Sequence, residues 1–522
     1  MGLPATKSYE YERRRPEETP LYEILRTELN TFVSEREIEN RSLPDYVTEE
    51  FEEFLRCGLP QYGFLRLKCT GCKAEKIVAF SCKKRGFCPS CAGKRMAESA
   101  AHLVDNVLPH VPYRQFVISY PFPLRFYMNA SRELCSKVLR IISTSIHRYY
   151  TKTAEKNGIK NSAAGSISFL QRFGSDLRLN PHHHILVPEG VYILVGDKPV
   201  FKKAPKITDE DVEKLLMEIS AKIRKYLVKK GYLNADGEIC LNPEVSSVFS
   251  ENEAVSMAAE SSFRNRIAFG ENAGKYVTKI GSGFGYEEEI PVAKSRLCRT
   301  MQGFSLHCAT AVKTSDRRGL ERLVSYMARG PLANERVTLT DLGKVKLKLK
   351  KNYSDGTSHL LFTKSEFIER LVALIPPPRT HLVRWSGFFA PNSPLRKAVT
   401  LKPKIKKGFQ FKSCSHDTED GEEGEGGSKE KSLRSSPWAR MLERVFKIDV
   451  AKCDRCDGTL KPVAAVTCPG GIRSYLTHMG LDPDPPSRDP PRHRQSSFEF
   501  STYELDCFPL PLDSDLPSLS YD

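Results

Sequence analysis

The sequence predicts an α+β protein of several domains. Strand-like runs such as SISFLQRF and HHHILV interleave with helical stretches such as DEDVEKLLMEISAKIRKYLVKK, without a regular βαβ period. This pattern favours an antiparallel sheet over a doubly wound fold. The 522 residues leave room for about three or four domains. Hydrophobic residues make up 40% of the chain and charged residues 28%, which excludes a wholly disordered or collagen-like protein.

The charge balance indicates a polyanionic partner. The chain has 80 Lys and Arg residues against 64 Asp and Glu, a formal charge of +16 at pH 7. Such an excess on a soluble chain most often serves nucleic-acid binding. No apolar run approaches the roughly 18 residues that a membrane span needs, and the N-terminus lacks the apolar core of a secretory signal. We therefore expect a cytoplasmic protein that does not bind membranes.

Changes in composition and periodicity along the chain predict its domain boundaries. Helical spacing comes first, then a cysteine-dense stretch with short strands, then a long region that mixes strands and helices. A basic and then glycine- and glutamate-rich segment cannot build a core. The predicted units are a helical region (1–55), a cysteine-rich domain (56–100), the main α+β domain (101–400), a flexible linker (401–437), a small CxxC module (438–482) and a disordered tail (483–522).

The cysteine-rich domain carries a zinc-site pattern. Cys69 and Cys72 form one Cys-x-x-Cys pair, Cys88 and Cys91 form another, and fifteen residues separate the pairs. Two such pairs can close the tetrahedral four-sulfur shell that structural zinc prefers. Basic residues beside the second pair would favour thiolates and contact nucleic acid: Lys83, Lys84 and Arg85.

The other cysteines are assigned more simply. Cys57 and Cys82 exceed the needs of one tetrahedral site. Either could be an alternative ligand, but we interpret them as buried free thiols, which is the simpler assignment. Cys453 and Cys456 form a third pair far along the chain, with Cys468 and His478 as the nearby completions. We do not predict a second zinc there.

A histidine triplet suggests a second kind of metal site. In a strand, His182 and His184 face the same side while His183 faces the other. Two such imidazoles can hold a divalent cation if a third ligand arrives from elsewhere. The candidates are His307 and Glu189, and we favour His307. A histidine run without metal is the alternative for a bare triplet.

Tyr326 is a candidate nucleophile. A helix capped by Ser315 or Asp316 carries it beside an apolar stripe until Gly330-Pro331 ends the helix. Simple packing is the usual role of such a tyrosine. A phenol beside a metal can also attack a phosphodiester, and Arg322 and Arg329, within about one turn, could neutralise phosphate charge.

One predicted strand has a wholly basic face. Lys344, Lys346, Lys348 and Lys350 alternate with apolar residues, so the lysines share one side. That face suits a DNA backbone, and lysines also protect exposed sheet edges from aggregation. The sequence favours neither explanation over the other.

These blocks together resemble one known family. FSCKKRGFCPSCAGKRM, AAHLVDNVLPHVPYRQFVIS, FLQRFGSDLRLNPHHHILVPEGVY and LERLVSYMARGPLANERV are similar to transposases of the insertion-sequence-ninety-one type. The similarity runs in order over roughly residues 45 to 480, far more than a lone motif.

The resemblance implies a zinc-binding domain followed by a nuclease of the histidine-hydrophobic-histidine (HUH) type, which nicks one DNA strand and drives rolling-circle transposition. It implies that His182 and His184 hold Mg²⁺ or Mn²⁺ and that Tyr326 forms a 5′-phosphotyrosine bond. The released 3′-hydroxyl would serve host replication. The implied partner is single-stranded DNA at element ends and target, and the implied location is the nucleoid.

Two positions depart from the family pattern. His183 replaces the usual bulky apolar residue of the triplet, and Arg322 stands where founding members have a second tyrosine. The chain therefore resembles the single-tyrosine branch, in which two cleavages need either reuse of Tyr326 or a homodimer.

Two other functions remain open on the sequence. A plasmid replication initiator or relaxase would share the histidines and the tyrosine, although neither is expected to begin with this cysteine module. A zinc-dependent DNA-binding protein without catalysis is the other alternative. Should Tyr326 not be the nucleophile, Tyr276 is the next candidate.

Overall fold

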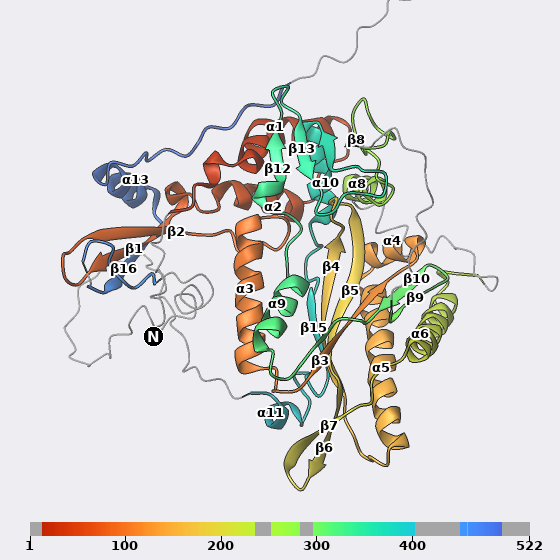
Figure 1. Ribbon diagram of the computed structural model, residues 1–522. Helices are drawn as coiled ribbons and strands as arrows, with labels where there is room; N and C mark the ends of the chain where they lie inside the picture. Colours follow the sequence, from red (N-terminus) through yellow and green to blue (C-terminus); the bar gives the residue numbers. More distant parts are fainter. Residues whose placement is uncertain (1–12, 235–251, 282–295, 402–448, 457, 493–522) are drawn as a thin grey trace, which may run out of the picture.

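The computed structural model describes residues 13–234, 252–281, 296–401, 449–456 and 458–492. Helices combine with four antiparallel sheets, so the predicted α+β class is confirmed (Figure 1). None of the described helices is both long and apolar enough to cross a membrane.

The main sheet has seven strands and forms the centre of the molecule. Its order is β15-β4-β5-β3-β10-β9, and β11 also pairs with β3. Both faces of β4 and β5 are buried over most of their length, because helices cover the sheet on both sides. The strands are β3 (Tyr113–Ser119), β4 (Gly165–Phe173), β5 (Leu179–Pro188), β9 (Cys298–Met301), β10 (Phe304–His307), β11 (Ala311–Val312) and β15 (Val383–Gly387).

Helices cover both faces of this sheet (Figure 1). On one face α4 (Phe122–Ala130), α5 (Arg132–Lys156) and α6 (Asp209–Lys229) bury a shared apolar core. On the other face α3 (Pro89–Asn106) and α9 (Arg317–Met327) lie side by side. Each face of the sheet is therefore covered by a different set of helices. Because successive residues of a strand point to opposite faces, neighbouring side chains in a strand contact different helices.

A second sheet carries the N-terminal helices. Strands β12 (Val337–Leu339), β13 (Val345–Lys348), β14 (His359–Phe362) and β8 (Thr278–Ile280) pair in that order. Its apolar face shares one core with α1 (Pro20–Ile38), α2 (Asp45–Arg56), α8 (Glu253–Phe263) and α10 (Lys364–Leu374). The N-terminal helices are therefore packed against the main domain.

The smallest elements complete the described chain. A hairpin of β6 and β7 extends from the end of the main sheet opposite the N-terminal helices (Figure 1). The remaining elements are β6 (Gly190–Val195), β7 (Lys198–Lys203), η1 (Pro16–Glu18), η2 (Pro60–Tyr62), η3 (Asn334–Arg336) and α11 (Arg396–Val399).

The C-terminal module is not a separate unit, which corrects the prediction for residues 438–482. Its strand β16 (Leu460–Val466) pairs with β1 (Phe64–Cys69), which pairs with β2 (Glu75–Ala79), so the C-terminal strand completes an N-terminal sheet. Helix α13 (Pro469–His478) packs on the same unit. Residues 438–448 lie outside the described residues.

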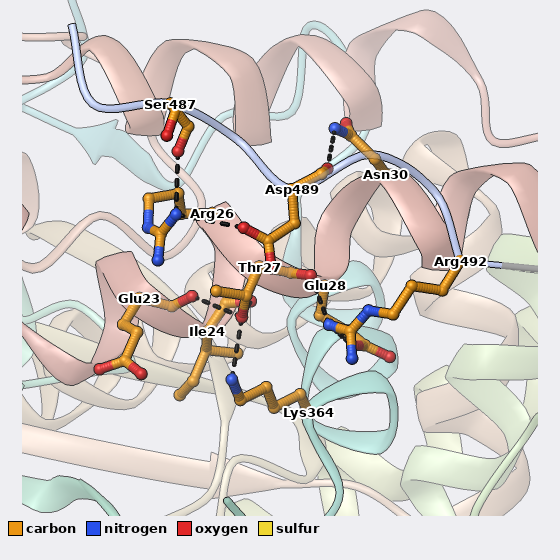
Figure 2. A network of polar contacts seen from close by, with 10 residues as sticks. All are labelled: Glu23, Ile24, Arg26, Thr27, Glu28, Asn30, Lys364, Ser487, Asp489 and Arg492. Carbon is orange, nitrogen blue, oxygen red and sulfur yellow. Dashed lines mark hydrogen bonds and ion pairs between the residues drawn. The ribbon is translucent and has the colours of Figure 1, made fainter.

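The tail prediction also needs correction at its start. Residues 483–492 lie along α1, where Asp489 and Arg492 contact its polar side chains and backbone (Figure 2). These polar contacts with α1 hold residues 483–492, which bury no apolar core of their own. The predicted linker, apart from Leu401, and residues 493–522 lie outside the described residues.

Candidate active site and metal centres

The histidine triplet lies in β5 and divides between the two sheet faces. His182 and His184 face the side covered by α3 and α9, and their ring centroids lie 4.9 Å apart. His183 faces the opposite side, where the Tyr120 hydroxyl lies 2.6 Å from its Nδ1 atom. The departure from the family pattern at His183 therefore adds no third imidazole to the pair.

Hydrogen bonds fix the two paired rings. His182 Nδ1 donates to the carbonyl of Asn180 over 2.7 Å, which leaves Nε2 as its lone-pair nitrogen. Gln115 Nε2 lies 2.7 Å from His184 Nδ1 and donates to it in this amide orientation. With the amide turned by 180°, its oxygen would take this place and accept the Nδ1 proton, which would leave His184 Nε2 with the lone pair. His184 Nε2 is buried and has no hydrogen-bond partner within the described chain. This orphaned nitrogen fits a metal ligand oriented by its outer partner.

Burial keeps the paired rings neutral. It lowers the pKa of His184 to about 3, and the nearby His182 and Arg329 act in the same direction. Burial likewise lowers the pKa of His182. Both imidazoles are therefore unprotonated at neutral pH, the form that binds a cation.

His307 stays a prediction as the third ligand, and no compact group of metal-ligand side chains in the described chain brings it together with the pair. It lies on β10 in register with Val117 of β3, which in turn is in register with His184. Two strand spacings, about 9–10 Å, thus separate His307 from the pair. The alternative, Glu189, is ion-paired with Arg114. Within the described chain, the two compact groups of metal-ligand side chains consist of cysteines alone.

Tyr326 lies directly beside the histidine pair. Its ring meets the His184 ring edge to face, with centroids 5.6 Å apart and an interplanar angle of 89°. The side chain is 49% exposed, so a substrate can reach it. Gln171 Nε2 donates to the carbonyls of Tyr326 and Met327 over 2.9 and 3.0 Å. Because Gln171 is in register with His182, it ties the last turn of α9 to the histidine strand.

Arg329 adds positive charge at the tyrosine. Its guanidinium lies 4.7 Å from the Tyr326 ring centroid and 5.5 Å from that of Phe173. Its Nε is buried without a hydrogen-bond partner in the described chain. It lines a cleft between the cysteine-rich part and the main domain, together with Arg85, Arg95 and Arg172. Arg322 is exposed one turn before Tyr326.

The tyrosine helix is held by α3. Arg317, in the first turn of α9, donates to the carbonyls of Leu108 and Pro109 over 3.0 and 3.2 Å. Asp316 caps α9 by accepting from the Gly319 amide, which confirms one of the two predicted caps. After α9, Gly330 passes so close to Ala92 of α3 that a Cβ atom at this glycine would overlap the alanine. The cysteine-rich part thus sets the position of Tyr326.

The predicted basic face is present on β13. The intervening Val345 and Leu347 are fully buried, while the lysines lie on the outer side. Because β13 pairs with β12 and β14 on its two sides, it is not an edge strand, and the edge-protection explanation does not apply to it. The lysines of this face are Lys344, Lys346, Lys348 and Lys350.

The basic residues of the cysteine-rich part have mixed roles. Arg85 donates to the carbonyl of Thr380 over 3.0 Å, and Lys84 pairs with Glu49 over 3.0 Å. Lys83 is exposed, and its carbonyl accepts from Arg95.

The cysteines form two four-sulfur groups, which corrects the single predicted site. Cys88 and Cys91 meet Cys57 and Cys82. Sulfur–sulfur distances of 3.3 to 3.7 Å within this group suit a tetrahedral metal site and are too long for disulfides. The interpretation of Cys57 and Cys82 as surplus thiols is therefore wrong. Hydrogen bonds from the other three thiols lower the pKa of Cys57, as a metal-binding thiolate requires.

Cys69 and Cys72 meet Cys453 and Cys456 instead. The unexpected partners arise because β1 and β16 pair, which brings together segments that sequence spacing cannot relate. Neither Cys468 nor His478 belongs to this group.

Sequence reasoning missed the two glutamines of the site. Gln115 and Gln171 are buried polar residues in strands that also bury large apolar side chains such as Phe116 and Phe169. That mismatch was the available signal, because a buried amide needs partners.

Two parts of the chain match families of known proteins. Residues 24–120 match the family described as "Transposase zinc-binding domain", and residues 165–397 match the family described as "Putative transposase". Searches of curated proteins and of solved structures gave no significant match. The two matched regions contain the first four-cysteine group, the histidine pair and Tyr326.

Proposed function

Because this chain belongs to the zinc-binding transposases of the insertion-sequence-ninety-one type, we propose that it nicks and joins single-stranded DNA through Tyr326. The observation that carries the proposal is the contact between the Tyr326 and His184 rings. A tyrosine used only for packing has no reason to meet a neutral imidazole of the pair while half of its surface stays accessible.

The residues divide the chemistry between them. His182 and His184 would hold Mg²⁺ or Mn²⁺ through their Nε2 atoms. When bound, the cation would polarise the phosphodiester and stabilise the charge that develops on its oxygens. Arg329, whose guanidinium lies 4.7 Å from the Tyr326 ring centroid, would bind the same phosphate.

The nicking step is a transesterification. The phenolic oxygen of Tyr326 forms a bond to phosphorus while the bond from phosphorus to the 3′-oxygen breaks. The phenolic proton passes to solvent, and the 3′-oxygen takes one up. The products are a 5′-phosphotyrosine and a free 3′-hydroxyl, and because one phosphoester replaces another, the reverse reaction joins strands.

The rest of the chain would guide the DNA. In this proposal residues 101–400 form the nuclease, and the arginine cleft beside Tyr326 receives the strand. The free 3′-hydroxyl would prime host replication at the nucleoid. With Arg322 in place of a second tyrosine, the second cleavage requires reuse of Tyr326 or a second protomer.

A covalent-adduct assay tests the proposal. We expect purified protein, Mn²⁺ and a single-stranded oligonucleotide from the element's end to give an adduct that survives denaturation, and Tyr326→Phe to abolish it. Tyr276→Phe is the matched control, because Tyr276 is also exposed and stacked by an arginine, with Arg266 at 4.5 Å. If Tyr276→Phe lost the adduct and Tyr326→Phe kept it, Tyr326 would not be the nucleophile. DNA binding without any adduct would favour a non-catalytic DNA-binding protein.

A further inference from the structure

We propose that Cys69, Cys72, Cys453 and Cys456 hold a second zinc ion, which fastens the C-terminal segment to the N-terminal part of the chain. This segment, residues 449–456 and 458–492, is called the C-terminal strap below. Neither family match includes Cys453 or Cys456, and the inference concerns metal content rather than DNA chemistry.

The sulfur geometry matches zinc. Cys69 and Cys456 lie 3.6 Å apart at their Sγ atoms, as do Cys72 and Cys453. Four sulfurs about 2.3 Å from a tetrahedral zinc are separated by about 3.8 Å. A disulfide would instead require about 2.05 Å. The four thiols therefore surround a space of the size of one ion.

Glycines beside the cysteines let the two Cys-x-x-Cys segments pack closely against each other. A Cβ atom at Gly458 would lie 2.7 Å from Cys69 Sγ and 3.2 Å from Cys456 Sγ. A Cβ atom at Gly71 would lie 3.3 Å from Cys456 Sγ. Gly71 also directs its amide at Cys69 Sγ over 3.4 Å. Each Cys-x-x-Cys turn thus has a glycine that lets the opposite turn pack onto the sulfurs, and amide donors favour thiolate.

Apart from these sulfurs, the strap is held by the pairing of β16 with β1, by two small apolar clusters and by side-chain contacts. The core beside the site consists of Leu67, Val450, Ala451, Leu460 and two of the cysteines. Further along, Tyr475 of α13 stacks on Phe64 with ring centroids 5.2 Å apart. Cores this small usually need a metal or a disulfide for stability.

The end of the strap depends on surface contacts. Arg26 pairs with Asp489 over 3.2 Å, and Asn30 donates to the carbonyl of Asp489 over 2.7 Å (Figure 2). Arg488 donates to Glu52 over 2.7 Å. Exposed ion pairs contribute little individually. Residues 483–492 should therefore stay on α1 only while the zinc and β16 hold the strap in place.

The two zinc sites should differ in lability. The first group contains three buried cysteines and one half-buried one, inside the largest core, whereas Cys72 of the second group is exposed. A chelator should therefore remove the second ion first.

Metal analysis and hydrogen exchange of the full-length protein test this inference. We expect two zinc ions per chain in the wild type and one in the variant Cys453→Ser/Cys456→Ser. In that variant β16, α13 and residues 483–492 should lose exchange protection while β5 keeps it. Cys468→Ser is the matched control, because this exposed cysteine lies outside both groups, and it should retain two ions.

A chelator titration of the wild type covers the case in which the double variant fails to fold. The first zinc released should be accompanied by loss of protection in the strap alone. One zinc in the wild type, two in the double variant, or a strap that stays protected after the first release would each overturn the inference. No DNA is present, so these results are independent of the nicking proposal.

Discussion

Two buried glutamines hold the histidine pair and the helix that carries Tyr326 in place. Gln115 contacts the His184 ring, and Gln171 binds two carbonyls at the end of the tyrosine helix. Each belongs to a strand next to the histidine strand. The site is therefore a property of three adjacent strands and one helix, and its geometry depends on residues that take no part in bond making.

Gln171→Ala should slow adduct formation by about 10- to 100-fold, because small displacements of a reacting group have large kinetic effects. DNA affinity should stay unchanged, since Gln171 binds only backbone carbonyls of α9. Single-turnover rates at saturating oligonucleotide, with binding measured separately, check this. Equal losses of affinity and rate would indicate a role in DNA binding instead.

Glu369 should make stability depend on pH. Burial raises its pKa to about 7, although the amides of Ala268 and Phe269 donate to it. In the unfolded chain a glutamate titrates near about 4.3. Between these values the folded state holds a proton that the unfolded state has lost. The free energy of unfolding therefore falls as pH rises through this window, by about 4 kcal/mol at most.

Glu369→Gln removes this ionisation and keeps one acceptor oxygen for the two amides. Unfolding midpoints at pH 5 and pH 7.5 should show a larger decrease for the wild type than for the variant. Identical decreases in the two proteins would exclude Glu369 as the source.

At the residue scale, the sequence alone indicated the histidine pair and Tyr326, because the signals lie within a few residues of each other. Two histidines separated by one residue share a strand face, and an arginine follows the tyrosine by three residues. It could not identify the third ligand, since the position of His307 depends on which strands are neighbours. The insertion of β3 between β5 and β10 is a property of the sheet order.

At the element scale, the contact between α3 and α9 links the zinc-binding part to the proposed nucleophile, Tyr326. Cys91 and Ala92 lie near the start of α3, and Gly330 packs on Ala92 just after Tyr326. A shift of α3 would move the tyrosine helix relative to β5. The first four-cysteine group is therefore expected to support catalysis through position alone.

Gly330→Ala should reduce adduct formation by about 10- to 100-fold, because its new Cβ overlaps Ala92 and displaces the end of α9. Adding Ala92→Gly makes room and should restore most of the rate. Ala92→Gly alone serves as the control, with a cost of up to about 1 kcal/mol in helix stability. No rescue in the double variant would mean that the contact does not position Tyr326.

The basic face of β13 should contribute to DNA affinity through charge. Replacing Lys344, Lys346, Lys348 and Lys350 with Gln should reduce the slope of log affinity against log salt by up to about 3 for single-stranded DNA. Fluorescence anisotropy at several salt concentrations measures this slope.

A matched charge control lies on and beside the β7 hairpin strand, at the other end of the molecule (Figure 1). Replacement of its exposed lysines should change the slope much less, and equal effects of the two sets would mean that only net charge matters. The control residues are Lys198, Lys202, Lys203 and Lys206.

At the scale of the whole molecule, the fold class was predictable from strand and helix periodicity, whereas the metal connectivity was not. The spacing of Cys69, Cys72, Cys88 and Cys91 is compatible with one zinc site formed by all four cysteines. It is equally compatible with two sites, to each of which one Cys-x-x-Cys pair contributes two ligands. The choice depends on β16 pairing with β1, a contact between the two ends of the described chain. Local spacing carries no information about such long-range pairing.

The described chain thus combines three functional parts: a zinc-binding part, a sheet that carries the histidine pair, and a strap that returns to the N-terminal helices. The zinc-binding part contacts the tyrosine helix, and the strap contacts the zinc-binding part. We expect the active-site geometry to depend on this chain of contacts.

The central claim is that the histidine pair of β5 and Tyr326 form one nicking centre. Its most direct test is peptide mapping by mass spectrometry of the adduct formed with Mn²⁺ and a single-stranded oligonucleotide. We predict that the tryptic peptide Leu323–Arg329 carries the nucleotide through its 5′-phosphate. We also predict that His182→Ala/His184→Ala abolishes the modification in a folded protein. A modified peptide elsewhere in the chain, or an adduct that persists without both histidines, would contradict the account.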